Sequence, residues 1–216
     1  MSEDSMSEGE EVLEYEDSTP LPLDDKCLHG TLSNGLTYYI QNNKKPEARA
    51  ELRLVVKIGS VYEDDDEQGL AHVVEHLAFR GTALYDTFEV VKYLESIGAK
   101  FGACQNAYTA FDETVYEQLI PIDKEGLLEK SLTVLKEWAN YIRCSDADVE
   151  AERSVVHEEW RQGRSAAGRS DEDYFATLMR GRRQHLSRQH TSLFVIRDLQ
   201  HHPSTRVQGA LVSATS

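Results

Sequence analysis

Hydrophobic and polar positions follow two periods along the chain, and the shorter period predicts strands. Residues 28–43 place β-prone stretches on both sides of Asn34-Gly35, a dipeptide that favours a two-residue hairpin turn. Residues 49–60 alternate and then run apolar, which is typical of a buried strand. Residues 100–121 are rich in Tyr, Thr, Phe and Val and predict two adjacent strands.

The longer period predicts helices in the segments between and after these strands. Helices are expected over residues 69–79, 86–97, 123–142 and 145–163. In the second of them, Asp86 is expected to cap the start and Gly98 to end the helix. This order of elements is neither alternating nor all-β. It predicts an α+β domain with helices packed on one face of a largely antiparallel sheet.

Composition separates this domain, residues 26–180, from two tails. Residues 1–25 hold ten acids and no Lys or Arg, so we expect an acidic disordered tail. Residues 163–170 have the composition of a flexible spacer, and a last helix is expected over 171–180. Residues 181–216 are basic and lack sustained periodicity, which indicates an irregular tail.

Charge and cysteine content narrow the possible partners and compartments. The net charge of −15 argues against nucleic-acid binding, and no apolar run is long enough to span a bilayer, so neither partner is expected. The acidic start has neither the basic nor the apolar region of a secretory signal. Cys27, Cys104 and Cys144 are widely spaced and odd in number, which favours a reducing, cytoplasmic location.

His72, Glu75 and His76 form an H-x-x-E-H motif within the helix expected over 69–79. A helical residue advances by about 100°, so the two histidines lie about 40° apart and can bind one ion. Imidazole suits zinc, and a zinc-coordinated water has a pKa of about 7. Glu75 would be close enough to accept the proton of that water. The alternative is an amphipathic helix with histidine as polar filler, and the acidic run at 63–67 is expected to be a solvated loop.

A third ligand is expected in the segment "ERSVVHEEW", which begins at Glu152. Glu152 and Glu159 are seven residues apart, hence about 20° apart on a helix, and Val156 shares their face. A carboxylate on an apolar face requires a metal or another partner. Glu158 points about 100° away and is expected to be solvated. On this argument either Glu152 or Glu159 could be the third ligand.

Three segments together carry a family resemblance: "HGTLSNGLTYYIQNNKKPEARAELRLVVKIGSVYEDDDEQGLAHVVEHLAFRGT", "FGACQNAYTAFDETVY" and "ERSVVHEEWRQGRSAAGR". The chain resembles the N-terminal catalytic domain of the pitrilysin/insulysin inverzincin metallopeptidases, a group that includes the processing peptidases. The resemblance covers roughly residues 27–180. It implies the fold of that domain, a zinc-dependent metalloendopeptidase activity and one zinc ion per chain.

The resemblance also implies a role for each matching residue of the metal site. His72 and His76 would bind zinc with Glu159 as the third ligand, and Glu75 would be the general base that activates water. Glu152 would support the site as a second acidic residue. Its interval of 76 residues from His76, against 83 for Glu159, fits smaller members of the group, but the order of residues in the motif favours Glu159.

Substrate and partners follow from the same resemblance. Asn106 and Ala107 match the exposed edge strand to which an extended peptide adds, so peptides or unfolded proteins are the implied substrate. Members pair this domain with a homologous domain or subunit, and the family pattern ends near residue 180. An alternative is therefore a truncated, catalytically incompetent chain that acts as a zinc-binding or assembly subunit. A third alternative is an α+β domain without metal.

Overall fold

The computed structural model describes residues 22–64 and 66–178. The chain forms two compact units that join between Pro46 and Glu47. The basic tail expected over 181–216 lies outside the described residues, as does all but the end of the acidic tail expected over 1–25. None of the helices within the described ranges is both long enough and apolar enough to cross a membrane.

The first unit contains an antiparallel hairpin of β1 (Cys27–Thr31) and β2 (Thr37–Gln41), in which the hairpin prediction is confirmed. The expected two-residue turn is wrong. The Leu32 N–H donates to the Leu36 carbonyl, which leaves a three-residue loop, and Gly35 within it has a φ of +88°. Glycine allows this left-handed conformation without steric cost, so the dipeptide still marks the turn.

The second unit is built on an antiparallel sheet in the order β3-β5-β4. Its strands are β3 (Arg49–Val56), β4 (Gln105–Thr109) and β5 (Thr114–Pro121), at the positions that the sequence predicts. Successive side chains point to opposite faces of a strand. The alternation of half-buried and exposed residues along β3 therefore places Leu52 and Leu54 on the covered face and Glu51 and Arg53 on the open face.

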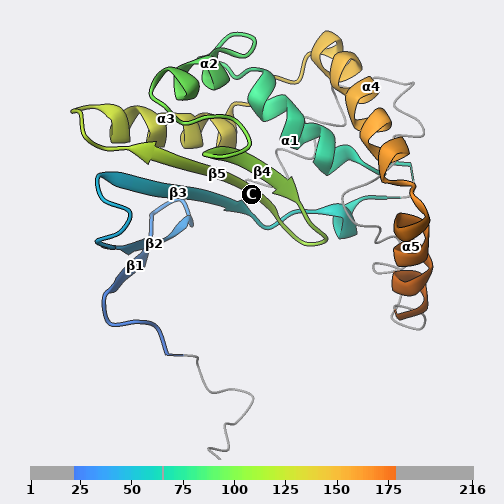
Figure 1. Cartoon of the computed structure of the whole chain (residues 1–216), viewed down its shortest axis with the longest axis horizontal. Coiled ribbons are helices and arrows are strands. Elements are labelled where there is room, and N and C mark those ends of the chain that lie inside the picture. Colours follow the sequence, from blue (N-terminus) through green and yellow to red (C-terminus); the bar gives the residue numbers. More distant parts are fainter. Residues whose placement is uncertain (1–21, 65, 179–216) are drawn as a thin grey trace, which may run out of the picture. The chain divides into compact units, whose positions relative to one another are not determined.

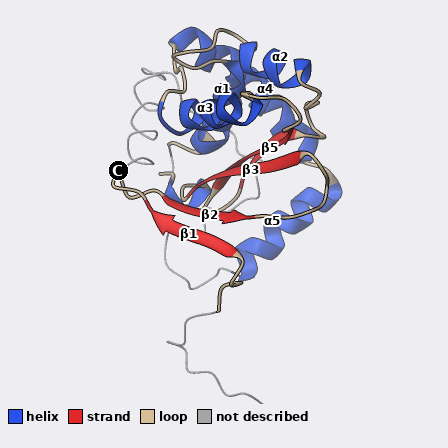
Figure 2. Ribbon diagram, turned by 90° about the vertical axis from the view of Figure 1, so that its left-hand side faces the viewer, coloured by secondary structure: helices blue, strands red, loops and turns tan. Residues whose placement is uncertain are grey.

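Helices cover one face of this sheet, which confirms the predicted α+β class (Figures 1 and 2). The helices of the second unit are η1 (Ser60–Tyr62), α1 (Leu70–Arg80), α2 (Glu89–Ser96), α3 (Leu127–Asn140), α4 (Asp146–Gly163) and α5 (Ala166–Leu178). α1 lies between α4 and the sheet region near β4, and α3 packs on β3 and β5. The fully buried side chains between the helices and the sheet include Val73, Leu77, Leu94, Tyr116, Ile120, Val134, Trp138 and Val156.

Trp138 links the helices to one another at the centre of this core. Its ring lies 5.4 Å from the ring of Tyr116 on β5, and its indole N–H donates to the carbonyl of Ala78 on α1 at 2.8 Å. A buried indole needs such an acceptor, because an unpaired N–H in an apolar core costs free energy. The contact fixes α1, the helix that carries the H-x-x-E-H motif, against α3 and the sheet.

Three helix starts differ from the sequence-based expectation. α2 begins at Glu89, because Phe88 adopts a φ of 59° and Asp86 does not cap the helix. α3 begins at Leu127 rather than residue 123, after Gly126 in the left-handed conformation. The flexible spacer expected over 163–170 is wrong in its second half, where α5 begins at Ala166. The start of α4 is as predicted, with Ser145 accepting from the Asp148 N–H at 3.1 Å.

Candidate metal centre

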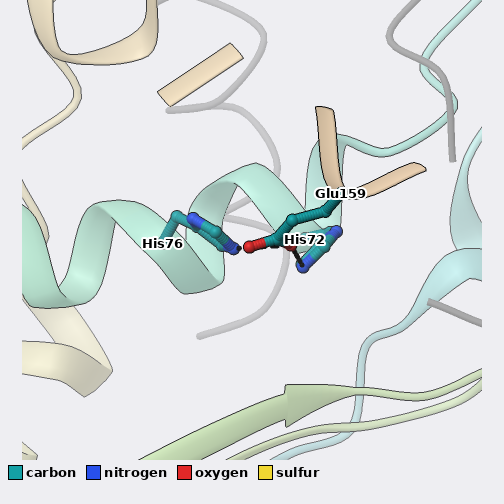
Figure 3. A group of neighbouring side chains, drawn as sticks. All are labelled: His72, His76 and Glu159. Atoms are coloured by element: carbon teal, nitrogen blue, oxygen red, sulfur yellow. Dashed lines mark ion pairs between the residues drawn. The ribbon is translucent and has the colours of Figure 1, made fainter. Parts of the chain in front are cut away.

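Helices α1 and α4 bring His72, His76 and Glu159 together (Figure 3). The Nε2 atoms of His72 and His76 each lie 3.5 Å from the same oxygen, Oε2 of Glu159. The two imidazole rings are 4.8 Å apart at their centroids and nearly perpendicular, at 83°. The three side chains therefore direct one nitrogen or oxygen each toward a common point.

The spacing of these atoms fits zinc. Zinc binds nitrogen and oxygen at about 2.0–2.1 Å in a tetrahedral arrangement, which separates neighbouring ligand atoms by about 3.4 Å. The observed nitrogen–oxygen separations of 3.5 Å are close to this value. Two histidines and one glutamate are also a known ligand set of catalytic zinc, in which the fourth position stays open. The ligand atoms of the three residues all lie within 4.8 Å of one another, so the residues present fit a zinc ion.

Glu152 contacts the other nitrogen of His76. Its Oε2 lies 3.3 Å from Nδ1 of His76, whereas Glu159 lies on the Nε2 side of the same ring. A carboxylate that accepts the Nδ1 proton leaves Nε2 unprotonated and free to bind a metal. The two glutamates that the sequence left as alternatives therefore occupy different places: Glu159 among the candidate ligands and Glu152 behind one of them.

The charges around the two histidines shift their pKa values in opposite directions. Burial, helped by the charge of His76, lowers the pKa of His72 to about 4. Burial also lowers the pKa of His76, but the hydrogen bond to Glu152 and the charges of Glu159, Glu75 and Glu152 outweigh it, so its pKa is raised above the usual value. In the metal-free protein His72 is thus neutral near pH 7, whereas His76 keeps its proton to a higher pH than an ordinary histidine does.

Glu75 lies beside this group with its carboxylate largely shielded from solvent. It is buried, and its Oε2 accepts a hydrogen bond from the hydroxyl of Thr109 on β4 at 2.8 Å. Burial raises the pKa of Glu75, while the bond from Thr109 and the charge of His76 oppose the rise. A carboxylate whose pKa is moved toward neutrality is suited to accept and then return a proton near pH 7.

β4 is an edge strand of the sheet, with β5 as its neighbour on one side only among the described strands. The Leu119 N–H donates to the Cys104 carbonyl at 2.6 Å, and the Ala110 N–H donates to the Glu113 carbonyl at 2.8 Å. Because bonded and non-bonded positions alternate in an antiparallel ladder, the backbone of Ala107 points away from β5.

The two residues predicted to bind a peptide therefore differ in what they offer. Asn106 faces β5 with its backbone, and only its exposed side chain is left. Ala107 presents its N–H and carbonyl to the open edge. At Gln105, the next position that points outward, the carbonyl already accepts from the Gly102 N–H at 2.8 Å. The open part of the edge thus begins at Ala107 and leads toward Thr109, the partner of Glu75.

Comparison with known proteins identifies the family. The family model described as insulinase, peptidase family M16, matches residues 38–187. The chain belongs to this M16 family. The resemblance seen in the sequence is therefore confirmed, and relatives of the chain carry the name zinc protease.

Relatives of this M16 domain are much longer proteins. The chain is 50% identical over 153 residues to a "zinc protease PQQL-like" of Arabidopsis thaliana, covering 71% of this chain but 16% of the relative. It is 40% identical over 152 residues to a chloroplastic stromal processing peptidase of rice, covering 68% of this chain and 11% of the relative. The chain thus spans about one-sixth of the length of the first of these relatives.

Solved structures of M16 proteases share the fold of this chain. The periplasmic protease PqqL from Escherichia coli matches with a TM-score of 0.83 and 31% identity, over 92% of this chain and 22% of the other. Pitrilysin matches with a TM-score of 0.71 at 20% identity, over 89% of this chain and 20% of the other, which shows the fold alone. This M16 chain thus matches about one-fifth of the length of each of these solved chains.

Glu63 is a residue of the M16 site region that the sequence did not reveal. It lies in the acidic run that we expected to be a solvated loop, but it is buried. Its two carboxylate oxygens accept from the N–H groups of Gly69 and Ala71 at 2.8 Å each, so it caps α1 just before His72. Burial raises its pKa to about 7, although the two N–H bonds favour the ionised form. Asp64 and Asp66 in the same run are exposed, so the contact with the start of α1 distinguishes Glu63 from them.

Zinc affinity of this M16 chain is expected to weaken as the pH falls below neutrality. A metal must displace the proton of His76, whose pKa is raised, whereas His72 has a pKa of about 4 and offers no competing proton above pH 5. The apparent dissociation constant should rise about tenfold per pH unit below the pKa of His76, as for one displaced proton. Chelator competition between pH 8 and pH 5.5 measures this slope. An affinity independent of pH would contradict the raised pKa of His76.

Proposed function

We propose that the chain is the zinc-binding catalytic domain of a metalloendopeptidase that hydrolyses peptide bonds in extended or unfolded segments. The observation that carries this proposal is the convergence of His72, His76 and Glu159 on one point, with the buried carboxylate of Glu75 beside it. Membership of a family of zinc proteases supports the same chemistry.

Each residue of the group has a role in this proposal. Zinc, when bound by His72, His76 and Glu159, polarises both the attacking water and the substrate carbonyl. Glu75 accepts a proton from the water as the water attacks, and returns it to the amine that leaves. The Thr109 hydroxyl, at 2.8 Å from Oε2 of Glu75, holds the carboxylate in one orientation. Glu152 holds the His76 ring with Nε2 directed toward the metal.

We further propose that the substrate binds as an added strand along β4. The outward N–H and carbonyl of Ala107 can pair with the main chain of any extended peptide, which provides affinity without strict sequence preference. A peptide in this place would run toward Thr109 and hence toward Glu75. The substrate on β4 and the catalytic group on α1 would then lie on neighbouring elements.

Replacing Ala107 by proline should weaken peptide binding. Proline removes the outward N–H, which the ladder with β5 does not use, so the sheet itself should tolerate it at an edge. Loss of one hydrogen bond of about 1 kcal/mol corresponds to roughly a fivefold rise in KM or Kd. Fluorescence anisotropy with a labelled unfolded peptide measures the affinity. Ala107→Ser, which retains the N–H, is the control, and equal affinity of the two variants would exclude Ala107 from the binding edge.

The relatives are far longer than this chain, and one solved relative bears on the substrate. The structure of the ferredoxin protease FusC in complex with Arabidopsis ferredoxin matches with a TM-score of 0.75 and 25% identity, over 86% of this chain and 20% of the other. We infer that a protein or peptide substrate is shared by this chain. We also infer that a homologous domain or subunit completes the enclosure of the substrate.

The second candidate function is a zinc-binding or assembly subunit without turnover, in which the group of His72, His76 and Glu159 binds zinc but no peptide is cleaved. A hydrolysis assay with the full chain, a fluorogenic unfolded peptide and stoichiometric zinc separates the two. Cleavage that requires zinc supports the peptidase. Zinc binding at one ion per chain without cleavage, both alone and with a homologous domain added, would support the subunit instead.

A further inference from the structure

The metal ligands belong to two longer stripes of charged and ionisable residues on α1 and α4. Every fourth residue of α1 contributes to a basic stripe of His72, His76 and Arg80. One face of α4 carries an acidic stripe of Asp148, Glu152 and Glu159. The stripes run in opposite directions: His72 and His76 meet Glu159, His76 also meets Glu152, and Arg80 meets Glu152 and Asp148.

Arg80 makes the contacts at the end of the stripes away from the metal. Its Nε donates to Oδ1 of Asp148 at 2.8 Å, and its Nη1 donates to Oε1 of Glu152 at 2.9 Å. The guanidinium also lies over the ring of Phe88, 5.6 Å from the centroid. Both carboxylates are buried, and Arg80 itself is about one-fifth exposed, at 22% of its side-chain surface. These contacts are therefore largely shielded from water and salt.

Glu152 is held from two sides by this arrangement. Arg80 binds its Oε1, and the other oxygen, Oε2, is left to face Nδ1 of His76. The hydrogen bond from His76, together with Arg80, lowers the pKa of Glu152, so the carboxylate stays ionised. Without Arg80, the Glu152 side chain would lose the contact that determines which oxygen points to His76. The orientation of the imidazole would then depend on the metal alone.

We propose that Arg80 is a positioning residue for the metal centre: it holds Glu152 against His76, and α4 against α1, before any metal binds. The inference rests on the proposed function, because it takes the group of His72, His76 and Glu159 to be a zinc site. It implies that the site is already arranged in the metal-free protein. Zinc would then bind without first having to order α4.

The electrostatics of the two helices support this assignment. The face of α4 that turns toward α1 carries three carboxylates, which repel one another, and a permanent cation at Arg80 offsets part of that repulsion. Arg80 lies in the last turn of α1 and Asp148 in the first turn of α4. Each charge thus also favours its own helix dipole. A planar guanidinium can bond two carboxylates at once, which a lysine ammonium does with poorer geometry.

The test compares the zinc affinity of Arg80→Gln with that of Arg143→Gln. Arg143 is the matched control, because its Nε donates to the other oxygen of Asp148 at 2.9 Å and its Nη2 to Thr87, rather than to Glu152. Zinc affinity is measured on the full chain by competition with a chromophoric chelator at pH 7.5. We expect Arg80→Gln to bind zinc about 10- to 100-fold more weakly, the usual effect of an outer-shell partner, and Arg143→Gln to stay within about threefold of wild type.

A second measurement separates positioning from a general loss of structure. Amide hydrogen exchange on metal-free protein should rise in the α4 segment 149–159 of Arg80→Gln, while the amides of β3 and β5 keep wild-type protection. Arg80→Lys keeps the positive charge but lacks the planar guanidinium that bonds both carboxylates, so its zinc affinity should be intermediate. This variant serves as the test if Arg80→Gln does not fold.

The possible results separate this inference from the proposed function. A folded Arg80→Gln protein with wild-type zinc affinity would overturn the role of Arg80 and leave the zinc site standing. An equal loss of affinity in Arg80→Gln and Arg143→Gln would also overturn it, because the effect would then come through Asp148. A wild-type chain that binds no zinc would overturn the proposed function, and this inference with it.

Discussion

Replacing Glu75 by glutamine is expected to abolish peptide hydrolysis while zinc stays bound. Glutamine has nearly the same shape and can still accept the hydroxyl proton of Thr109 through its amide oxygen, so the local packing should persist. It cannot accept a proton from water at neutral pH. A general base contributes about 10²- to 10⁴-fold to a rate, so kcat should fall by about that factor or more, since the same group also returns the proton.

The zinc content and the rate of peptide hydrolysis can both be measured on one preparation of the protein. Elemental analysis should find one zinc per chain in wild type and in Glu75→Gln, and kcat/KM for a fluorogenic peptide should differ by the factor above. The matched control is Thr109→Val, which removes the hydroxyl bonded to Glu75 but leaves the carboxylate in place. It should lose far less activity than Glu75→Gln. A glutamine variant that cleaves peptides within tenfold of wild type would show that another group is the base.

The local part of the site could be predicted from the sequence, because helical spacing alone determines it. His72, Glu75 and His76 lie within five residues, and the regular geometry of one helix places them on neighbouring turns. The seven-residue spacing of Glu152 and Glu159 likewise places both on one face of α4. Helical spacing does not determine which of the two glutamates lies at Nε2 of His76, because that depends on how α1 and α4 pack together. The contacts with Nδ1 and Nε2 of His76 distinguish them.

The features that the sequence did not predict depend on tertiary contacts. Glu63 is one acid among several in its run, and only the folding of the loop onto α1 makes it a cap. Arg80 continues the spacing of His72 and His76, but its role becomes visible only when Glu152 and Asp148 lie opposite. The late start of α2 follows from the left-handed conformation of Phe88, which no local pattern indicates. Local periodicity thus predicts elements, while packing between them decides which polar groups meet.

The distinction between Glu159 and Glu152 leads to the second large effect. Replacing Glu159 by glutamine should weaken zinc binding by more than about 100-fold, because it removes one of the three candidate ligands. Replacing Glu152 by glutamine should weaken it by about 10- to 100-fold, the usual effect of a partner behind a ligand. In that variant His76 keeps its ring and loses only the carboxylate at Nδ1.

Glu158→Gln is the matched control for both variants, because Glu158 is adjacent to Glu159 in sequence but is paired with Arg161 at 3.3 Å rather than with the histidines. Its zinc affinity should equal that of wild type.

Chelator competition at pH 7.5 ranks the zinc affinities of the variants. Cobalt substitution adds a second measurement, because the visible spectrum of Co²⁺ responds to the number and type of its ligands. The spectrum should change in Glu159→Gln and stay close to wild type in Glu152→Gln. The reverse order, with Glu152→Gln the weaker binder, would make Glu152 the ligand and Glu159 the supporting residue, because the energetic cost of losing a bond to the metal exceeds that of losing a bond to one of its ligands.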